Sequence, residues 1–441
     1  MSKRNFILLI IVLILTAIAV FGFFYFQKEP TPPGGESTGT NFISQFNPFG
    51  DKKPTPPTAP STETPDYQPN PTGETPKMKL TKISSMPIAG FAVFSKERLK
   101  EIPIPEVVTP QSPLGGLTAK STPPPTEFAP ALRYVDRMTG NIYQTFADKI
   151  EERKFSTTVI PKVYEAYFGN KGESVVMRYL KTDGRTIETF VGALPKELLG
   201  GDTTGENEIK GSFLPNNVKD ISVSSDGSKI FYLFESGENM IGAILNLSNN
   251  KKIQIFDSPF TEWLSQLPNN NTITLSTKPS ARIPGYMYSM DGAGKNLIKV
   301  LGDINGLTAL MSPNGKLVLY GNSNLSINVY HTDTRNSDVL GIKTLPEKCV
   351  WGKISDTIYC AVPKSVTPGE YPDTWYQGEV SFSDQLWKVD LKTGNATLIL
   401  DPATITGGRE IDAIKLSLDE GENYLFFVNK KDSFLWKFEL K

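Results

Sequence analysis

The chain has 441 residues, of which 46 are basic and 47 acidic, with a single histidine and two cysteines. A nucleic-acid-binding protein needs a basic excess to neutralise phosphates, so this balance argues against that class of partner. One histidine also excludes chemistry that needs two imidazoles as general bases or zinc ligands. The 36 glycines and 34 prolines are typical of a protein with many turns between short strands.

The N-terminal segment predicts a membrane anchor, because residues 6–26 (FILLIIVLILTAIAVFGFFYF) carry no charge. As a helix this run is about 32 Å long, which matches the hydrocarbon core of a bilayer. Lys3 and Arg4 precede it and favour a cytoplasmic N-terminus, with the rest of the chain outside the cytoplasm. A cleaved signal peptide is the alternative, but its apolar region is only about 7–15 residues long. We therefore expect residues 1–28 to be a cytoplasmic tip and one transmembrane helix.

The next segment, residues 29–77, is rich in proline, threonine, serine and glycine. Such a composition cannot bury enough apolar surface to offset the entropy of ordering, so we expect a disordered stalk with polyproline II character. Its reach is at most about 150 Å. Residues 78–441 are expected to form the globular domain, within or beside which the proline-rich stretch 103–130 forms a long loop.

A hairpin pattern recurs from about residue 160 onward, in which two apolar strands flank a turn rich in Asn, Asp or Gly. The turns at Asp226, Asn270, Asn314 and Asp356 are 44, 44 and 42 residues apart, which is the size of a propeller blade. Six segments carry this pattern: 163–180, 221–234, 263–276, 309–321, 349–362 and 414–428.

A second hairpin follows most of the first ones, at residues 287–301, 328–340 and 386–400, and residues 134–146 resemble the last of these. Two hairpins make a four-stranded antiparallel blade, so the chain is predicted to be an all-β propeller. Residues 79–84 would supply the missing outer strand of the last blade, and residues 89–94 would begin the first blade. This closure gives seven blades. The alternative is six blades, if residues 79–146 lie outside the ring.

The repeats resemble those of TolB-type, WD40-like β-propellers, on the sequences SSDG and SPNG before an apolar strand and LWKVDLKTG and YSMDGAGKN after it. The resemblance covers roughly residues 163–441, and the anchor and stalk are similar to those of membrane-anchored bacterial propellers. It implies a docking platform in the cell envelope.

The insertion at residues 368–384 (PGEYPDTWYQGEVSFSD) is the candidate ligand-binding site. Aromatic side chains beside polar groups are typical of binding hot spots and carbohydrate platforms. If the insertion joins the second and third strands of its blade, it lies on the face that usually binds ligands. The alternative is a long loop that packs its own aromatics onto the domain. The candidate residues are Tyr371, Asp373, Trp375, Tyr376, Gln377, Glu379, Phe382 and Asp384.

The two cysteines, Cys349 and Cys360, face each other across one predicted hairpin, so a structural disulfide is expected, with two buried free thiols as the alternative. His331 lies near Asp333, but no nucleophile elbow or reactive cysteine accompanies it, and we interpret it as a turn residue. The aspartates of KTDG, SSDG and SMDG are interpreted as turn formers rather than calcium ligands. No catalytic residue, metal site or cofactor is predicted.

These patterns favour a membrane-anchored binding or scaffold module that engages an envelope protein or a glycan through one propeller face. The alternative is a propeller-type hydrolase such as a carboxylate-based glycosidase, which needs two acids roughly 5–9.5 Å apart in a central pocket. A purely architectural surface protein is a third possibility.

Overall fold

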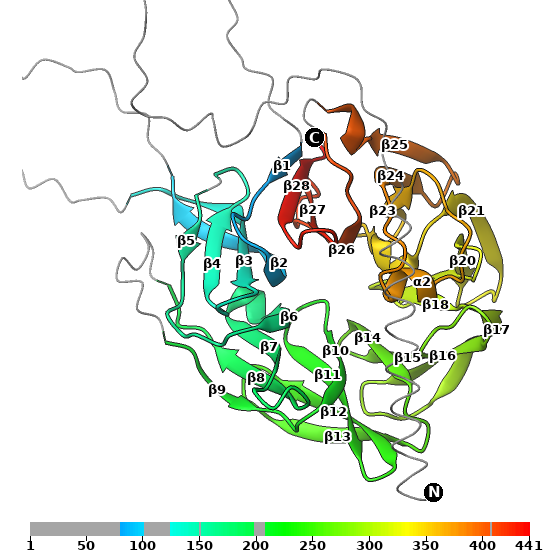
Figure 1. Cartoon of the computed structure of the whole chain (residues 1–441), viewed down its shortest axis with the longest axis horizontal. Helices are drawn as coiled ribbons and strands as arrows, with labels where there is room; N and C mark the ends of the chain where they lie inside the picture. The colour runs from blue at the N-terminus through cyan, green and yellow to red at the C-terminus, as the bar shows by residue number, and fades with distance from the viewer. Residues whose placement is uncertain (1–79, 101–123, 150, 198–207, 406–407) are drawn as a thin grey trace, which may run out of the picture. The chain divides into compact units, whose positions relative to one another are not determined.

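The computed structural model describes residues 80–100, 124–149, 151–197, 208–405 and 408–441. These residues form seven four-stranded antiparallel sheets, which are arranged as blades around a common axis (Figure 1). The prediction of an all-β propeller is confirmed, and the alternative of six blades is wrong.

The blades follow the chain in order, and each runs from its innermost to its outermost strand. Blade 1 contains β2 (Ile88–Leu99), β3 (Thr126–Asp136), β4 (Ile142–Phe146) and β5 (Arg153–Lys154). Blade 2 contains β6 (Val163–Gly169), β7 (Ser174–Leu180), β8 (Ile187–Ala193) and β9 (Lys210–Phe213). Blade 3 contains β10 (Val218–Val223), β11 (Lys229–Ser236), β12 (Asn239–Asn246) and β13 (Lys252–Ser258). Blade 4 contains β14 (Trp263–Asn269), β15 (Thr272–Thr277), β16 (Pro284–Asp291) and β17 (Ile298–Asn305). Blade 5 contains β18 (Thr308–Met311), β19 (Leu317–Gly321), β20 (Ser326–His331) and β21 (Ser337–Lys343). Blade 6 contains β22 (Cys349–Trp351), β23 (Thr357–Pro363), β24 (Asp384–Asp390) and β25 (Ala396–Leu400). Blade 7 contains β26 (Ala413–Leu418), β27 (Tyr424–Asn429), β28 (Leu435–Glu439) and, as its outer strand, β1 (Leu80–Lys82).

The turn aspartates act as the sequence predicted. In the hairpin between β10 and β11, Asp226 accepts hydrogen bonds from the Ser224 hydroxyl and the Ser228 amide at 2.7 and 3.0 Å, and Gly227 supplies a φ of +72°. Asp183 and Asp291 likewise accept backbone amides two to four residues further on. These bonds use the carboxylates within their own turns, which is the behaviour of turn formers.

The ring closes as predicted, through a strand from the beginning of the domain. β1 pairs with β28, with Leu80 opposite Phe438 and Lys82 opposite Trp436. Leu80 and Phe438 are both buried, and they share an apolar cluster with β23 and β27. Apolar clusters of this kind lie between neighbouring blades, so each blade covers the face of the next.

The first blade departs from the prediction in two ways. Residues 126–130, expected to belong to a loop, are the start of β3, where Pro130 pairs with Ser95 of β2. Proline is tolerated there because β4 begins its pairing with β3 only at Ala131, so the Pro130 nitrogen is not needed as a donor. In addition, the 134–146 hairpin forms the second and third strands of the blade, and β5 is the fourth.

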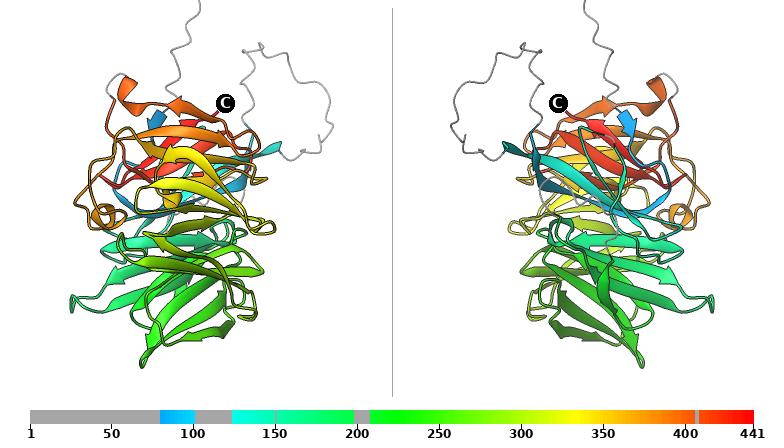
Figure 2. Two further views of the ribbon diagram at one scale, coloured as in Figure 1. Left: turned by 90° about the vertical axis from the view of Figure 1, so that its right-hand side faces the viewer. Right: turned by 90° about the vertical axis from the view of Figure 1, so that its left-hand side faces the viewer.

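Two faces of the ring follow from the antiparallel order of the blades. One face carries the connections between second and third strands and those between successive blades; the other carries the remaining hairpins. Residues 364–383, hereafter the insert, join β23 to β24 and contain the short helix α2 (Asp373–Tyr376). Figure 2 shows the insert projecting from one face, which we call the insert-bearing face.

The predicted anchor (1–28) and stalk (29–77), and most of the 103–130 stretch, lie outside the described residues. Among the residues that are described, no helix is long and apolar enough to cross a membrane.

Candidate functional site

The insert joins the second and third strands of its blade and is fastened to other blades at several points. The Asp373 carboxylate accepts a hydrogen bond from the Ala281 amide of blade 4 at 2.6 Å, and Glu370 forms an ion pair with Arg282. On the other side, Lys430 of blade 7 donates to the Trp375 carbonyl at 2.5 Å. These bonds hold the insert over blades 4 to 7 in one position.

Aromatic side chains of the insert point into the domain. Tyr371, Trp375 and Phe382 are 3%, 4% and 2% exposed, and they pack with Leu325 and Leu345 in one apolar cluster. The rings of Trp375 and Phe382 are stacked with centroids 6.1 Å apart. These three predicted site residues therefore anchor the loop, as the alternative interpretation had it, and do not face a ligand in this conformation.

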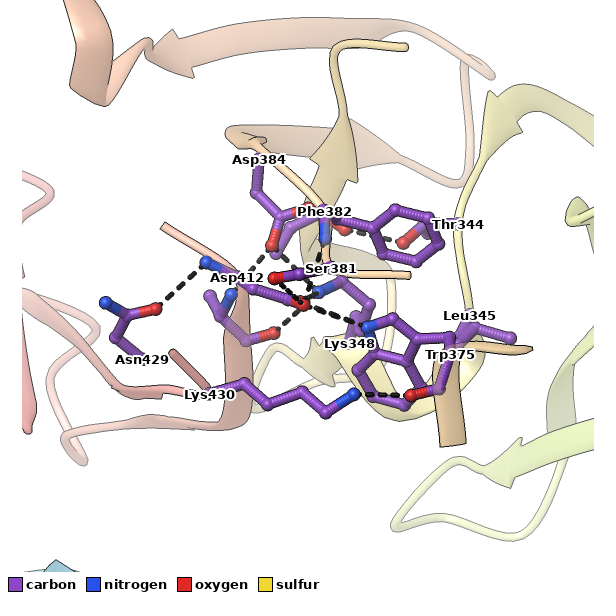
Figure 3. A network of polar contacts seen from close by, with 12 residues as sticks. Thr344, Leu345, Lys348, Trp375, Ser381, Phe382, Asp384, Asp412, Asn429 and Lys430 are labelled. Carbon is purple, nitrogen blue, oxygen red and sulfur yellow. Dashed lines mark hydrogen bonds and ion pairs between the residues drawn. The ribbon is translucent and has the colours of Figure 1, made fainter. Parts of the chain in front are cut away.

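Beneath these rings lies a buried lysine (Figure 3). Lys348 belongs to the 3-10 turn η3 (Pro346–Lys348), which leads directly into the innermost strand β22. Its ammonium lies 2.8 Å from Asp384 Oδ2 and 2.5 Å from Asp412 Oδ1, and it donates to the Ala413 carbonyl at 3.0 Å. Lys348, Asp384 and Asp412 are each at most 1% exposed. We call these three residues the Lys348 cluster.

The Asp412 carboxylate links the insert to blade 7. Besides Lys348 it accepts hydrogen bonds from Trp375 Nε1 and the Phe382 amide, both at 3.0 Å, and from the Ser381 hydroxyl at 3.1 Å. Burial opposes its ionisation, but Lys348 and these bonds together hold the pKa of Asp412 below its ordinary value. Every one of these bonds stabilises the same conformation of the insert.

Asp384 has a different environment, although it shares the ammonium. Burial raises the pKa of Asp384 to about 6, against the influence of Lys348 and of the Ala413 amide, which donates to it at 2.7 Å. Asp384 and Asp412 do converge, as the hydrolase alternative requires of two acids, but both point at Lys348 and neither reaches solvent. This pair has the environment of a structural ion cluster.

The solvent-exposed part of the site lies beside the Lys348 cluster. Tyr376 is 41% exposed, and its hydroxyl donates to Glu347 Oε2 at 2.8 Å. The Glu347 side chain is open to solvent, yet enough protein surrounds it that desolvation raises its pKa to about 7, against the influence of Tyr376, Lys348 and Lys430. Gln377 and Glu379 are also exposed. We call Glu347, Tyr376, Gln377 and Glu379 the insert edge.

The structure thus divides the eight predicted site residues. Four are buried: Tyr371, Trp375, Phe382 and Asp384. Three are exposed: Tyr376, Gln377 and Glu379. Asp373 is half-buried, and it is bonded to blade 4. Sequence reasoning missed Glu347, Lys348, Asp412 and Lys430. Their one signal was the position of Glu347 and Lys348 between two apolar strands, which did not distinguish them from ordinary loop charges.

The remaining candidate residues, the two cysteines and His331, are bonded to neighbouring strands of their own blades. Cys349 and Cys360 occupy opposite positions in the β22–β23 hairpin and form a disulfide. His331 Nε2 lies 2.9 Å from Asp338 of the neighbouring strand β21. Within the described ranges, no group of three or more His, Cys, Asp or Glu side chains is placed to hold a metal ion.

Known proteins resemble this chain in fold alone. No family model matches the sequence, and no curated protein matches it. Among solved structures, the chain is similar to an oligogalacturonate lyase in complex with manganese, with a TM-score of 0.46 and 10% identity over 70% of this chain and 85% of that one. An oligogalacturonate lyase from Vibrio parahaemolyticus gives 0.47 and 8% over 70% and 86%, and TolB from Acinetobacter baumannii gives 0.37 and 10% over 69% and 61%.

Proposed function

We propose that this propeller is a binding module that captures an envelope protein or a glycan at the insert edge. One observation carries the proposal: the insert is the longest connection fully described between two strands, and it is hydrogen-bonded to blades 4 and 7 while presenting an aromatic side chain and several acceptors to solvent. A loop fixed before binding loses little entropy when a partner docks, so its contacts translate more fully into affinity.

The chemistry of the insert edge suits a partner rich in hydrogen-bond donors. Tyr376 offers an amphipathic ring of the kind enriched in hot spots, and Glu347, Gln377 and Glu379 offer acceptors around it. A partner that covers Glu347 would meet a carboxyl group whose protonation changes near neutral pH, so its affinity would depend on pH.

Membrane attachment is the second part of the proposal, and it rests on the sequence. The uncharged run 6–26 with Lys3 and Arg4 before it supports an anchor with a cytoplasmic N-terminus, and the composition of residues 29–77 supports a stalk. Protease protection of the domain in intact cells tests this part. Digestion of the propeller by an external protease is expected, and full protection would contradict it.

The binding proposal is tested with the full chain, by chemical crosslinking in membranes and by a glycan array. Tyr376→Ala is expected to reduce capture of the same partner at least about 10-fold, which is a typical loss for a hot-spot tyrosine. The matched control is Lys316→Ala, because Lys316 is exposed in a hairpin of the opposite face. Equal capture by both variants, with the fold intact, would contradict a role for the insert edge.

A further inference from the structure

The face opposite the insert holds a cavity of about 220 Å³ between blades 1 and 2. Its wall is formed by the second half of β2, the hairpin between β6 and β7, and the residues that follow β8. Its charged lining residues are four basic ones, Lys96, Arg133, Lys171 and Lys196, and three acidic ones, Glu97, Glu173 and Glu197. This cavity is far along the strands from the insert edge, so it is a separate site.

Three cations converge on one carboxylate at this cavity. Glu197 lies 2.6 Å from Lys96 Nζ and 3.8 Å from Arg133 Nη2, and it forms a third ion pair with Arg153. Its side chain is 3% exposed, whereas that of Lys96 is 19% and that of Arg153 38% exposed. We call these four residues the Glu197 cluster. Over the whole lining of the cavity there are four basic side chains and three carboxylates, so one positive charge is in excess.

The electrostatics of Lys96 agree with this excess. Burial lowers the pKa of Lys96 to about 8, and Arg133 and Arg153 lower it further, while Glu173 has the opposite effect. Burial likewise lowers the pKa of Arg133 to about 10. Arg133 is nevertheless held firmly, because it donates to the Gly172 carbonyl at 2.6 Å and lies 4.0 Å from the centroid of the Phe155 ring.

The backbone at the rim of the cavity is strained. Asn170, Lys171 and Gly172 are consecutive and have φ values of +48°, +52° and +83°. Glycine adopts this left-handed region freely and asparagine tolerates it, whereas lysine adopts it only under strain, and such strain clusters at ligand sites. Here the turn places Lys171 at the cavity and directs the Gly172 carbonyl to Arg133.

We propose that this cavity binds an oxyanion, a carboxylate, sulfate or phosphate group, beside the Glu197 cluster. Lys96 and Lys171 pair with the anion, and Arg133 forms the fixed positive floor. Lys96 and Arg133 already form ion pairs with the carboxylate of Glu197, so a carboxylate fits these two side chains. At about 220 Å³ the cavity is smaller than the roughly 300–1,000 Å³ of typical ligand sites, so the anionic group belongs to a fragment no larger than a monosaccharide.

Calorimetric titration of the full chain at pH 7 and constant ionic strength tests this proposal, with sodium sulfate, D-glucuronate and uncharged D-glucose as probes. Sulfate and glucuronate are expected to bind and glucose is not. Stronger binding of sulfate points to an inorganic anion, and stronger binding of glucuronate to an acidic sugar. Binding of neither anion would overturn the proposal.

Two charge changes of opposite sign make the test specific. Lys96→Gln is expected to weaken anion binding about 10-fold, and Glu197→Gln to strengthen it about 10-fold, because they remove one positive and one negative charge at the same point. Lys219→Gln is the matched control, since Lys219 is exposed and paired with Glu235 in blade 3. Should Lys96→Gln fail to fold, the exposed rim variant Lys171→Gln replaces it, with a loss of about 3-fold expected.

Affinity in the unsubstituted chain is also expected to fall as the pH rises through about 8, where Lys96 loses its proton. A similar anion response in all variants would show that the ions act on the protein surface in general, and would overturn the assignment of this cavity.

Discussion

Two clusters of charged side chains lie on opposite faces of the ring, and each inverts the composition of the other. The Lys348 cluster holds one cation between two carboxylates, all at most 1% exposed and covered by the rings of the insert. The Glu197 cluster holds one carboxylate among three cations, of which Lys96 and Arg153 are partly exposed and Lys96 and Arg133 line a cavity. In the first, protein groups bond to Lys348 and to both oxygens of Asp412, and Asp384 Oδ1 has no partner among the described residues. The second lies at a cavity lined by four basic and three acidic residues.

The difference teaches that burial and partners, rather than the number of charges, separate a structural ion cluster from a binding site. Asp412 receives bonds from Lys348, Trp375, Ser381 and Phe382, which leaves little for a ligand to add. Burial first, and then Arg133 and Arg153, lower the pKa of Lys96, so an added anion would offset part of the cost of its buried charge.

Removing the central cation is the strongest test of this comparison. Lys348→Met should destabilise the domain by about 3–5 kcal/mol, because it leaves two carboxylates facing each other without a counter-ion in the interior. Glu197→Gln should cost less, since Lys96 and Arg153 can turn toward solvent. Urea unfolding measures both.

The control for this pair is Lys316→Met at an exposed hairpin position, for which a change below about 0.5 kcal/mol is expected. Equal losses for Lys348→Met and Glu197→Gln would show that the two clusters are not different in kind.

Loss of the aromatic anchor should have a smaller and local effect. Trp375→Ala removes a buried ring and a donor to Asp412, so the insert should lose about 3 kcal/mol of local stability. Amide exchange at Trp375-adjacent positions such as Gln377, which donates to the Asp373 carbonyl, should then be about 100-fold faster.

Tyr376→Ala is the matched variant for that measurement, because its ring is 41% exposed. It should leave exchange in the insert nearly unchanged while it reduces partner capture. Fast exchange in both variants would mean that the insert edge is part of the anchor.

The smallest expected effect concerns pH. The native state keeps the Glu347 proton up to about pH 7, whereas the unfolded chain releases it near the ordinary pKa of 4.5. Raising the pH through this window therefore favours unfolding, and ionised Glu347 destabilises the native state above pH 7. Glu347→Gln should raise the melting temperature by on the order of 1–2 °C at pH 8 and by less at pH 5.

Asp384, with a pKa of about 6, titrates in the same pH range in the unsubstituted chain and in Glu347→Gln. The difference in melting temperature between these two proteins therefore reports on Glu347. Glu420→Gln, at an exposed hairpin position, should shift the melting temperature equally at both pH values. An identical shift for Glu347→Gln would contradict the raised pKa.

Much of the fold could be predicted because its signals are local and periodic. A turn such as that at Asp226 is formed by hydrogen bonds among residues next to one another in the sequence. The 44-residue spacing of these turns indicates blades that pack radially. The position of Cys349 opposite Cys360 followed from one hairpin. The start of β3 was missed, because Pro130 and the run of prolines just before the strand indicate a loop unless the pairing of Pro130 is known.

The site was predicted less well, since its partners come from distant parts of the chain. Lys348 and Asp412 are 64 residues apart, and nothing in either neighbourhood indicates that they meet. Aromatic residues in a long loop fit both a ligand platform and an anchor, and the choice depends on which way Trp375 points. A side-chain direction of that kind is set by tertiary packing and not by local pattern.

The seam between β1 and β28 has a consequence for biosynthesis. Leu80 pairs with Phe438, which is synthesised near the end of the chain. The first strand to leave the ribosome is therefore among the last to form its hydrogen bonds. At roughly 5–20 residues per second, that interval is on the order of 20–70 s. During it the edge of blade 7 does not exist, and an unpaired Leu80–Lys82 strand is open to pairing with a neighbouring nascent chain. Slow translation of the last blade would lengthen this period of exposure.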